Sequence, residues 1–147
     1  MLYTRKGDDG TTKTFGCDQR ISKSSAVAEA LGAMDEVNSF LGLCKIKADR
    51  LKFPFENLSF EKIVHDIQKN LFIVQAELAG ATGSISENKV QEIEEITDGI
   101  EKELPKIQSF FISGNTELSA SFDFARTLAR RAESARATSA RPARARA

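Results

Sequence analysis

The sequence predicts an all-α fold, an antiparallel bundle of helices. Apolar residues recur at spacings of three and four in four successive segments, which is the period of a helix that buries one face. Residues suited to helix caps and helix ends separate these segments. No segment alternates between apolar and polar residues as a half-buried strand would, and there is no internal repeat. We therefore predict a helical bundle without strands.

The first helix is predicted at about residues 25–48. Its apolar stripe runs from Val27 to Cys44, and Ser24 or Ser25 can cap its first turn. The second helix carries a stripe from Ile63 to Leu78. Potential N-caps precede this stripe and glycines suited to a helix end follow it, namely Asn57, Ser59, Gly80 and Gly83.

The third and fourth helices are predicted from their caps as well as from their stripes. Asn88 with Gln91 resembles a capping box, and Pro105 ends the third helix because proline disfavours the α conformation of the residue before it. Thr116 is the predicted N-cap of the fourth helix, whose apolar face runs from Leu118 to Ala132.

We predict one main domain at residues 1–133 and a low-complexity tail at residues 134–147. The tail contains only Ala, Arg, Ser, Thr and Pro, and no large apolar residue follows Leu128. The fourth helix is thus expected to continue for a few turns and then fray. The tail holds four arginines and no acid, so residues 1–133 carry 17 basic and 21 acidic side chains, a net charge of −4. This argues against a nucleic-acid-binding function of the main domain.

The remaining composition bounds the chemistry. Cys17 and Cys44 form no C-x-x-C pattern, so we expect reduced thiols and neither a disulfide nor a zinc site. The single histidine, His65, has no partner His or Cys within a turn, which favours an ordinary helix-face histidine over a ligand. No apolar run approaches the roughly 20 residues that span a membrane. We expect a soluble, cytoplasmic protein without a side-chain metal site.

An anion site is predicted near the N-terminus. The segment Tyr3 to Lys13 combines two glycines, three threonines and three cations. Glycine allows backbone N–H groups to face a ligand, while hydroxyls and cationic groups supply further donors for phosphate oxygens. Lys23 adds another cation nearby. The segment matches neither a Walker A loop nor an EF-hand, and the competing interpretation is an ordinary turn.

A second cationic group lies on the fourth helix. Arg126 and Arg130 are four residues apart and share one face, with Arg131 and Glu133 following. Intrahelical ion pairs on a solvated face are the simpler interpretation, and spacing alone favours it. Arg126, however, lies beside the apolar face and needs a partner. Asp35 on the first helix is the candidate, either within one chain or across a subunit boundary.

These motifs together resemble the PduO-type ATP:cob(I)alamin adenosyltransferases. The resemblance covers about residues 3–133 and rests on segments in the same order and at similar spacing. They are Tyr3–Thr12, Lys23, Glu29–Ser39, Phe110–Gly114 and Ala125–Glu133. It implies a ferritin-like helical bundle that assembles as a homotrimer, with ATP between neighbouring subunits and a corrinoid next to it.

The resemblance also implies an activity and roles for residues. The 5′-deoxyadenosyl group of ATP would pass to the cobalt of cob(I)alamin with release of triphosphate, in the presence of Mg²⁺. Asp35 and Arg126 would form an intersubunit salt bridge near the corrinoid, and Phe110 would keep the lower ligand off the cobalt. The residues implied to contact ATP are Thr4, Arg5, Lys6, Gly7, Asp8, Gly10, Thr12, Lys13, Lys23, Arg130, Arg131 and Glu133. A reductase and an adenosylcobalamin-dependent mutase are the implied protein partners.

The sequence departs from the family pattern at its end. Ser134 stands where the family usually has arginine, and the family's last helix, with an Asn-Arg-Leu-Ser-Asp-like motif, is expected to be missing or altered. Two alternatives therefore stay open. One is a truncated, catalytically impaired member that binds ATP or trimerises without turnover. The other is a helical interaction protein with an incidental glycine loop.

Overall fold

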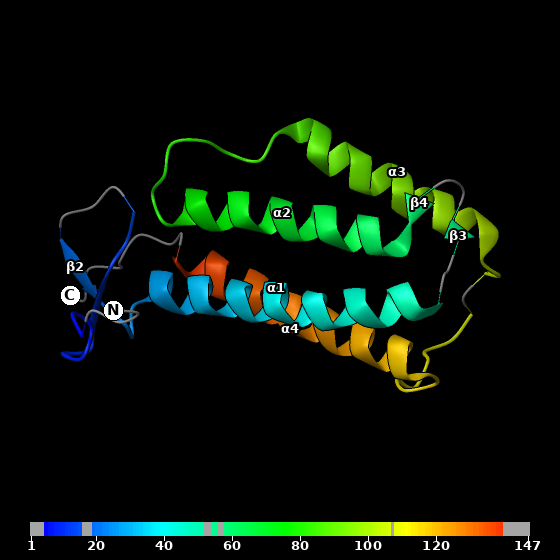
Figure 1. Ribbon diagram of the computed structural model, residues 1–147, viewed down its shortest axis with the longest axis horizontal. Helices are drawn as coiled ribbons and strands as arrows, with labels where there is room; N and C mark the ends of the chain where they lie inside the picture. Colours follow the sequence, from blue (N-terminus) through cyan, green and yellow to red (C-terminus); the bar gives the residue numbers. More distant parts are fainter. Residues whose placement is uncertain (1–4, 16–18, 52–53, 56–57, 107, 140–147) are drawn as a thin grey trace.

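The computed structural model describes residues 5–15, 19–51, 54–55, 58–106 and 108–139. Four helices dominate it, and they run alternately in opposite directions (Figure 1). Their bounds are α1 Ala26–Leu51, α2 Phe60–Leu78, α3 Glu87–Glu103 and α4 Glu117–Ser139. The predicted all-α antiparallel bundle is therefore confirmed.

The prediction that the chain forms no strands is wrong. The described residues contain two small antiparallel sheets, one pairing β1 (Thr11–Lys13) with β2 (Arg20–Ser22) and one pairing β3 (Pro54–Phe55) with β4 (Leu58–Ser59). Each strand has only two or three residues, too few to show an alternating pattern in the sequence. The first sheet is a hairpin in which Thr12 lies opposite Ile21.

Helix α1 forms the centre of the bundle, because it packs against both α2 and α4. Its buried side chains are Ala30, Ala33, Met34, Val37, Asn38, Leu41, Cys44 and Ala48. Val64 of α2 and three small residues of α4, Ser121, Ala125 and Ala132, meet this face. Small residues let helix axes approach closely, so α4 lies tightly against α1.

Three of the predicted caps are confirmed. The Ser25 hydroxyl accepts a hydrogen bond from the Ala28 N–H (3.3 Å), and that of Ser59 from Lys62 N–H (3.1 Å). At the start of α4, the Thr116 hydroxyl accepts from the Ser119 N–H (3.1 Å), and the Ser119 hydroxyl accepts from the Thr116 N–H (3.0 Å). These bonds satisfy backbone donors that the first helical turn leaves unpaired.

The predicted start of the third helix is wrong. Ser86 has the extended conformation of an N-cap (φ −75°, ψ 149°), and α3 begins at Glu87, which places Asn88 inside the first turn. An acidic residue in the first turn is favoured by the helix dipole, and the sequence pattern did not separate these two starts. The predicted end is confirmed, since Leu104 before Pro105 is extended.

Helix α2 ends in a Schellman motif. Gly80 takes the left-handed conformation (φ 94°), its N–H bonds to the Glu77 carbonyl (3.0 Å), and the Ala81 N–H bonds to the Ala76 carbonyl (2.9 Å). A Cβ at residue 80 would lie 3.0 Å from the Phe15 carbonyl oxygen. Both the left-handed conformation and this close contact therefore favour glycine at residue 80. The contact also shows that the end of α2 lies against Phe15, shortly after β1.

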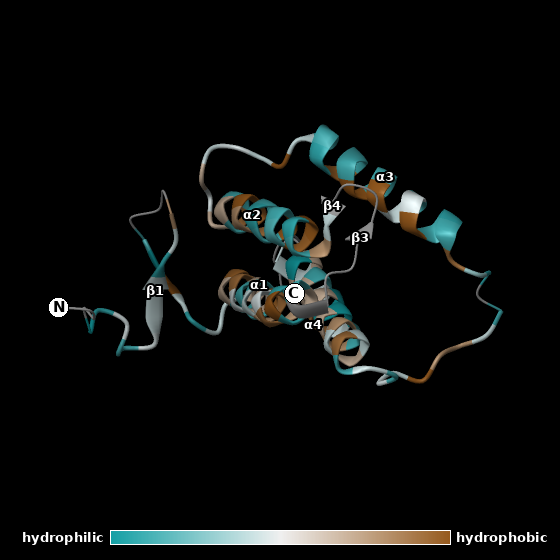
Figure 2. Cartoon of the chain, turned by 45° about the vertical axis from the view of Figure 1, so that its right-hand side comes forward, coloured by the Kyte–Doolittle hydropathy of each residue, from teal (hydrophilic) through white to brown (hydrophobic). Residues whose placement is uncertain are grey.

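Helix α4 passes the expected domain boundary at residue 133 and continues to Ser139, with Ala135 packed against the core. The connection between α3 and α4 carries exposed apolar side chains, among them Phe110, Phe111 and Ile112. Figure 2 shows this hydrophobic stretch in a connection that runs outside the helices. No helix in the described part of the chain is long and apolar enough to cross a membrane.

Candidate functional site

The N-terminal segment forms a compact loop ahead of β1. The Asp8 N–H bonds to the Arg5 carbonyl (3.3 Å), and the Gly10 N–H bonds to the Gly7 carbonyl (3.2 Å). Arg5 (φ 56°) and Gly10 (φ 79°) are both left-handed, so the backbone reverses sharply at each end. We refer to residues 5–10 with the strands β1 and β2, where the anion site is predicted, as the anion loop. Thr4, a predicted ATP-binding residue, lies outside the described residues.

Lys23 lies against the anion loop and bonds to its backbone, and the sequence had predicted that it lies nearby. Its backbone N–H bonds to the Gly10 carbonyl (2.9 Å), and its Nζ donates to the Gly7 carbonyl (2.7 Å). A Cβ at residue 7 would lie 3.1 Å from both Lys23 Nζ and the Thr11 carbonyl oxygen. Gly7 therefore permits the close approach of this ammonium group.

Arg20, which the sequence analysis did not single out, organises the same loop. Its Nη2 donates to the carbonyls of Lys6 and Thr11, the latter at 2.9 Å. Its Nε donates to the Thr11 hydroxyl (2.5 Å). The guanidinium also lies 3.6 Å from an Asp9 carboxylate oxygen. An alternation of polar and apolar residues along Arg20–Ser22 could have indicated a strand that brings Arg20 beside the loop. Three residues, however, are too few to establish such an alternation.

Asp9 completes the network around Arg20. Its Oδ1 accepts hydrogen bonds from the Thr11 hydroxyl (2.7 Å) and the Thr11 N–H (2.9 Å). These bonds, together with the charge of Arg20, hold the pKa of the Asp9 carboxyl below its ordinary value of 3.8. At neutral pH Asp9 is ionised and offsets the charge of Arg20.

Helix α4 presents the second predicted group, and two of its arginines, Arg130 and Arg131, are already paired. Arg130 Nη1 lies 2.6 Å from a Glu133 carboxylate oxygen, three residues along the helix. Arg131 forms an ion pair with Glu36 of α1. The simpler interpretation, intrahelical pairing, thus describes Arg130 in the absence of a ligand. All four side chains are at least half exposed, so these pairs are weak.

The within-chain version of the Asp35–Arg126 pair is wrong. Both side chains are exposed, and the chain makes no ion pair between these two described residues. The acid that reaches α4 is Glu36, the neighbour of Asp35, and it pairs with Arg131. Neighbouring positions on a helix point about 100° apart, so only one of the two acids can face α4 directly.

The predicted groups occupy two ends of the bundle. The anion loop lies at the same end as the last turns of α4, whereas the connection that carries Phe110 lies at the opposite end (Figure 1). Helix α4 begins at Glu117, directly after this connection, and Arg130 lies thirteen residues further along. At a rise of about 1.5 Å per residue, the start of α4 and Arg130 are about 20 Å apart along the helix. Phe110 is fully exposed. One chain therefore does not bring Phe110 to the anion loop.

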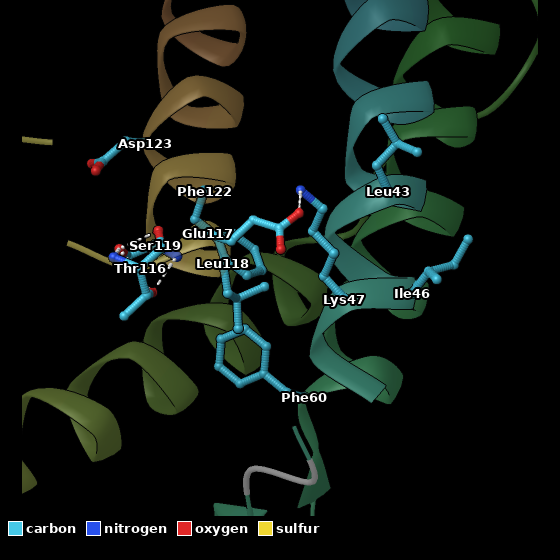
Figure 3. Close-up of a pocket in the computed structure, with 10 residues that line it drawn as sticks. All are labelled: Leu43, Ile46, Lys47, Phe60, Thr116, Glu117, Leu118, Ser119, Phe122 and Asp123. Carbon is cyan, nitrogen blue, oxygen red and sulfur yellow. Dashed lines mark hydrogen bonds and ion pairs between the residues drawn. The ribbon is translucent and has the colours of Figure 1, made fainter. Parts of the chain in front are cut away.

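A large apolar pocket lies near the Phe110 end, between α1, α2 and α4. Its volume is about 910 Å³, and Leu43, Phe60 and Phe122 contribute to its walls. Lys47 Nζ reaches Glu117 (2.8 Å) and the Ser121 hydroxyl (3.0 Å) at its edge, and Figure 3 shows the Lys47–Glu117 pair. None of the described lining residues is a predicted phosphate ligand. Apolar walls and a cation that is already paired do not suit a triphosphate.

Protein ligands for a metal are not assembled in the described part of the chain. No group of three His, Cys, Asp or Glu side chains there could hold a metal ion. His65 is exposed on α2, and Cys44 is buried in α1, where burial raises the pKa of its thiol. Cys17 lies outside the described residues.

Comparison with known proteins gives consistent matches over nearly the whole chain. The sequence model of the cobalamin adenosyltransferase family matches residues 2–146. The corrinoid adenosyltransferase PduO of Citrobacter freundii is 37% identical over 139 residues, covering 90% of this chain and 39% of that protein. The corrinoid adenosyltransferase of Bacillus subtilis (strain 168) is 34% identical over 136 residues, covering 90% of this chain and 68% of that protein. The chain thus spans about two fifths of PduO.

Solved structures show the same fold. A variant of a PduO-type ATP:corrinoid adenosyltransferase from Lactobacillus reuteri, complexed with cobalamin and ATP, superposes with a TM-score of 0.81 at 26% identity. The match covers 94% of this chain and 77% of the other. Another variant of the enzyme from that organism, complexed with ATP, gives a TM-score of 0.80 at 26% identity.

The Asp9 network predicts a titration that NMR can measure. Because the folded-state pKa of Asp9 is lowered, its ionised form stabilises the hairpin above about pH 4, and this contribution is lost as the pH falls through the lowered pKa. We expect the carboxyl carbon of Asp9 to titrate below 3.8 and the Thr11→Val variant to shift it back toward 3.8. Thr12→Val is the matched control. An unchanged midpoint in Thr11→Val would contradict the assignment.

Proposed function

The chain belongs to the cobalamin adenosyltransferase family, and on this premise we propose that it transfers the 5′-deoxyadenosyl group of ATP to the cobalt of a reduced corrinoid. The observation that carries the proposal is that α4, which holds Arg130 and Arg131 in its second half, runs toward and ends at the end of the bundle where the anion loop lies (Figure 1). Two cationic segments from distant parts of the sequence are thereby available to one polyphosphate.

The phosphate ligands would come from both segments. In the loop, Lys23 holds the Gly7 carbonyl through one Nζ–H and keeps two further donors for phosphate oxygens. Arg5, Lys6 and Lys13 are exposed around it. The other proposed loop contacts are Thr4, Gly7, Asp8, Gly10 and Thr12. Among these groups, the cations, the threonine hydroxyls and the Gly7 N–H would supply the donors for a triphosphate.

The arginines of α4 would exchange partners when ATP binds. Exposed ion pairs contribute only about 0–1 kcal/mol, whereas a guanidinium can bind phosphate through two parallel hydrogen bonds. Arg130 can thus leave Glu133, and Arg131 can leave Glu36, at little cost. Glu133, released from Arg130, becomes free to contact the nucleotide.

The chemistry requires no nucleophile from the protein. Cobalt(I) supplies an electron pair to C5′ of ATP, a Co–C bond forms, the C5′–O bond breaks, and triphosphate leaves with that bonding pair. The protein would hold C5′ in line with cobalt and stabilise the charge on the leaving triphosphate. Lys23, Arg130 and Arg131 serve the second task.

We propose that Mg²⁺ enters with ATP. Mg²⁺ is commonly held by substrate phosphates, water and one or two carboxylates rather than by a cage of protein ligands. The absence of a three-ligand cluster in the described chain fits this mode, and Asp8 is an exposed carboxylate within the loop. The ion would neutralise part of the triphosphate charge.

The corrinoid side of the site would be completed by another subunit. The connection between α3 and α4, which carries Phe110, lies at the opposite end of the bundle from the anion loop, so one chain alone cannot place both beside one cobalt. We therefore propose a homotrimer whose sites lie between subunits, with Phe110 against the lower face of the corrinoid. Asp35 and Arg126, unpaired with each other in the chain, are available for a salt bridge across that boundary.

Further partners follow from the reaction. Cobalt must be reduced to cobalt(I) before the transfer, so a reductase would supply electrons, and an adenosylcobalamin-dependent mutase would use the product. We place these steps in the cytoplasm. The exposed ring of Phe110 could occupy the lower face of the corrinoid and keep the lower axial ligand off the cobalt. Loss of that ligand makes cobalt(II) easier to reduce.

Loss of one cation should weaken ATP use without unfolding the bundle. We expect Lys23→Ala and Arg130→Ala each to raise the KM for ATP by roughly 10- to 150-fold, since each removes a charged donor worth about 1.5–3 kcal/mol. Turnover is measured by the absorbance change on adenosylation of chemically reduced cobalamin. Lys102→Ala, an exposed cation on α3, is the control. ATP binding by the wild-type protein without product would instead support the catalytically impaired alternative.

Mixed oligomers test whether two chains share a site. Lys23→Ala chains lack the ATP contact and Phe110→Ala chains lack the aromatic ring, so each pure oligomer should adenosylate slowly when the assay starts from cob(II)alamin and a reductant. We expect oligomers assembled from both chains to regain activity, because some sites then combine an intact Lys23 with an intact Phe110. Mixed oligomers as slow as both parents would place the whole site within one chain.

A further inference from the structure

We propose that Arg20 is a positioning residue that holds the anion loop in its triphosphate-binding shape before ATP arrives. This inference rests on the proposed function and adds a role that the predicted ATP ligands do not include. Arg20 lies on β2, opposite Lys13 of β1, and its guanidinium reaches back across the hairpin to the loop.

The guanidinium joins two separate parts of the backbone. It donates to the carbonyl of Lys6, at the start of the loop, and to both the carbonyl and the hydroxyl of Thr11, at the start of β1. Its planar arrangement of N–H groups suits several acceptors at fixed angles, which a lysine ammonium on a flexible stem does not reproduce. Arg20 thus fixes the distance between the two ends of the loop.

This contact also orients the loop amides. In a trans peptide the C=O and the N–H point in opposite directions. Because the Lys6 carbonyl faces Arg20, the N–H of Gly7 in the same peptide group points away from the guanidinium. Within the described part of the chain the Gly7 N–H has no hydrogen-bond partner. Arg20 therefore presents a backbone donor of the kind that an anion site uses.

Arg20 itself is committed mainly to the loop rather than to the phosphates. Three of its N–H groups are already used by Lys6 and Thr11, and its side chain is only 31% exposed. Asp9 lies 3.6 Å from it and offsets its charge. We call the hydrogen-bonded network of Arg20, Asp9 and Thr11 the clasp. The clasp therefore favours ATP binding by holding the loop in shape, whereas Lys23 supplies the positive charge that contacts the phosphates.

Two variants separate shape from charge. We expect Arg20→Ala to raise the KM for ATP by about tenfold while kcat at saturating ATP stays within about twofold, because the loop can still be ordered by the bound ligand. Arg20→Lys keeps the charge but loses the planar fork, and we expect it to resemble Arg20→Ala. The control is again Lys102→Ala. Wild-type KM in Arg20→Ala, full rescue by Arg20→Lys, or a fall in kcat alone would overturn the proposal.

Hydrogen exchange of the ligand-free protein tests the clasp without any assumption about function. We expect amides of residues 5–13 to exchange faster in both Arg20 variants at millisecond labelling times, with α1, α2 and α4 unchanged. Unchanged loop exchange would overturn the proposal. If the wild-type protein failed to bind ATP, the proposed function would fall, whereas faster loop exchange in the variants would still show that the clasp exists.

Discussion

The close packing of α1 against α4 is the constraint on which the rest of the structure depends. Small buried residues on α4, above all Ala125 and Ala132, let its backbone approach the alanine-rich face of α1. The two helices then carry the acids of α1 and the arginines of α4 along neighbouring edges, where Glu36 meets Arg131. A larger side chain at Ala125 or Ala132 would push α4 away from α1 and so separate the arginines of α4 from the acids of α1.

The same packing determines where the anion loop lies. Helix α1 begins three residues after Lys23, so the hairpin is attached directly to the helix that α4 contacts. The Phe15 carbonyl lies close to Gly80 and brings the hairpin to the end of α2 as well. The loop is therefore placed by two helices and shaped internally by Arg20 and Lys23.

The helices could be predicted from the sequence because each one buries a stripe over several turns. Ser25, Ser59 and Thr116 were identifiable as caps since their side chains act on backbone groups within the next three residues. The strands could not be predicted, because two or three residues show no period. The start of α3 was misplaced by two residues, as Ser86 and Asn88 are both acceptable cap types.

The candidate site was predictable only in part. Glycines, threonines and cations crowded into a short segment indicated an anion loop, and Lys23 was close enough in sequence to be included. Arg20 was missed because its role depends on a turn that the sequence pattern does not specify. Whether Asp35 or Glu36 faces α4 depends on how α1 is rotated about its axis. The apolar stripe of α1 does not define that rotation closely enough to choose between neighbouring residues.

The central claim is that the anion loop and the arginines of α4 bind one triphosphate. Hydrogen exchange with and without ligand tests it most directly, with peptides that cover residues 5–13 and 126–133. We expect ATP with Mg²⁺ to slow exchange in both segments together and adenosine, which lacks phosphates, to slow it in neither. Protection of one segment without the other under saturating ATP would contradict it.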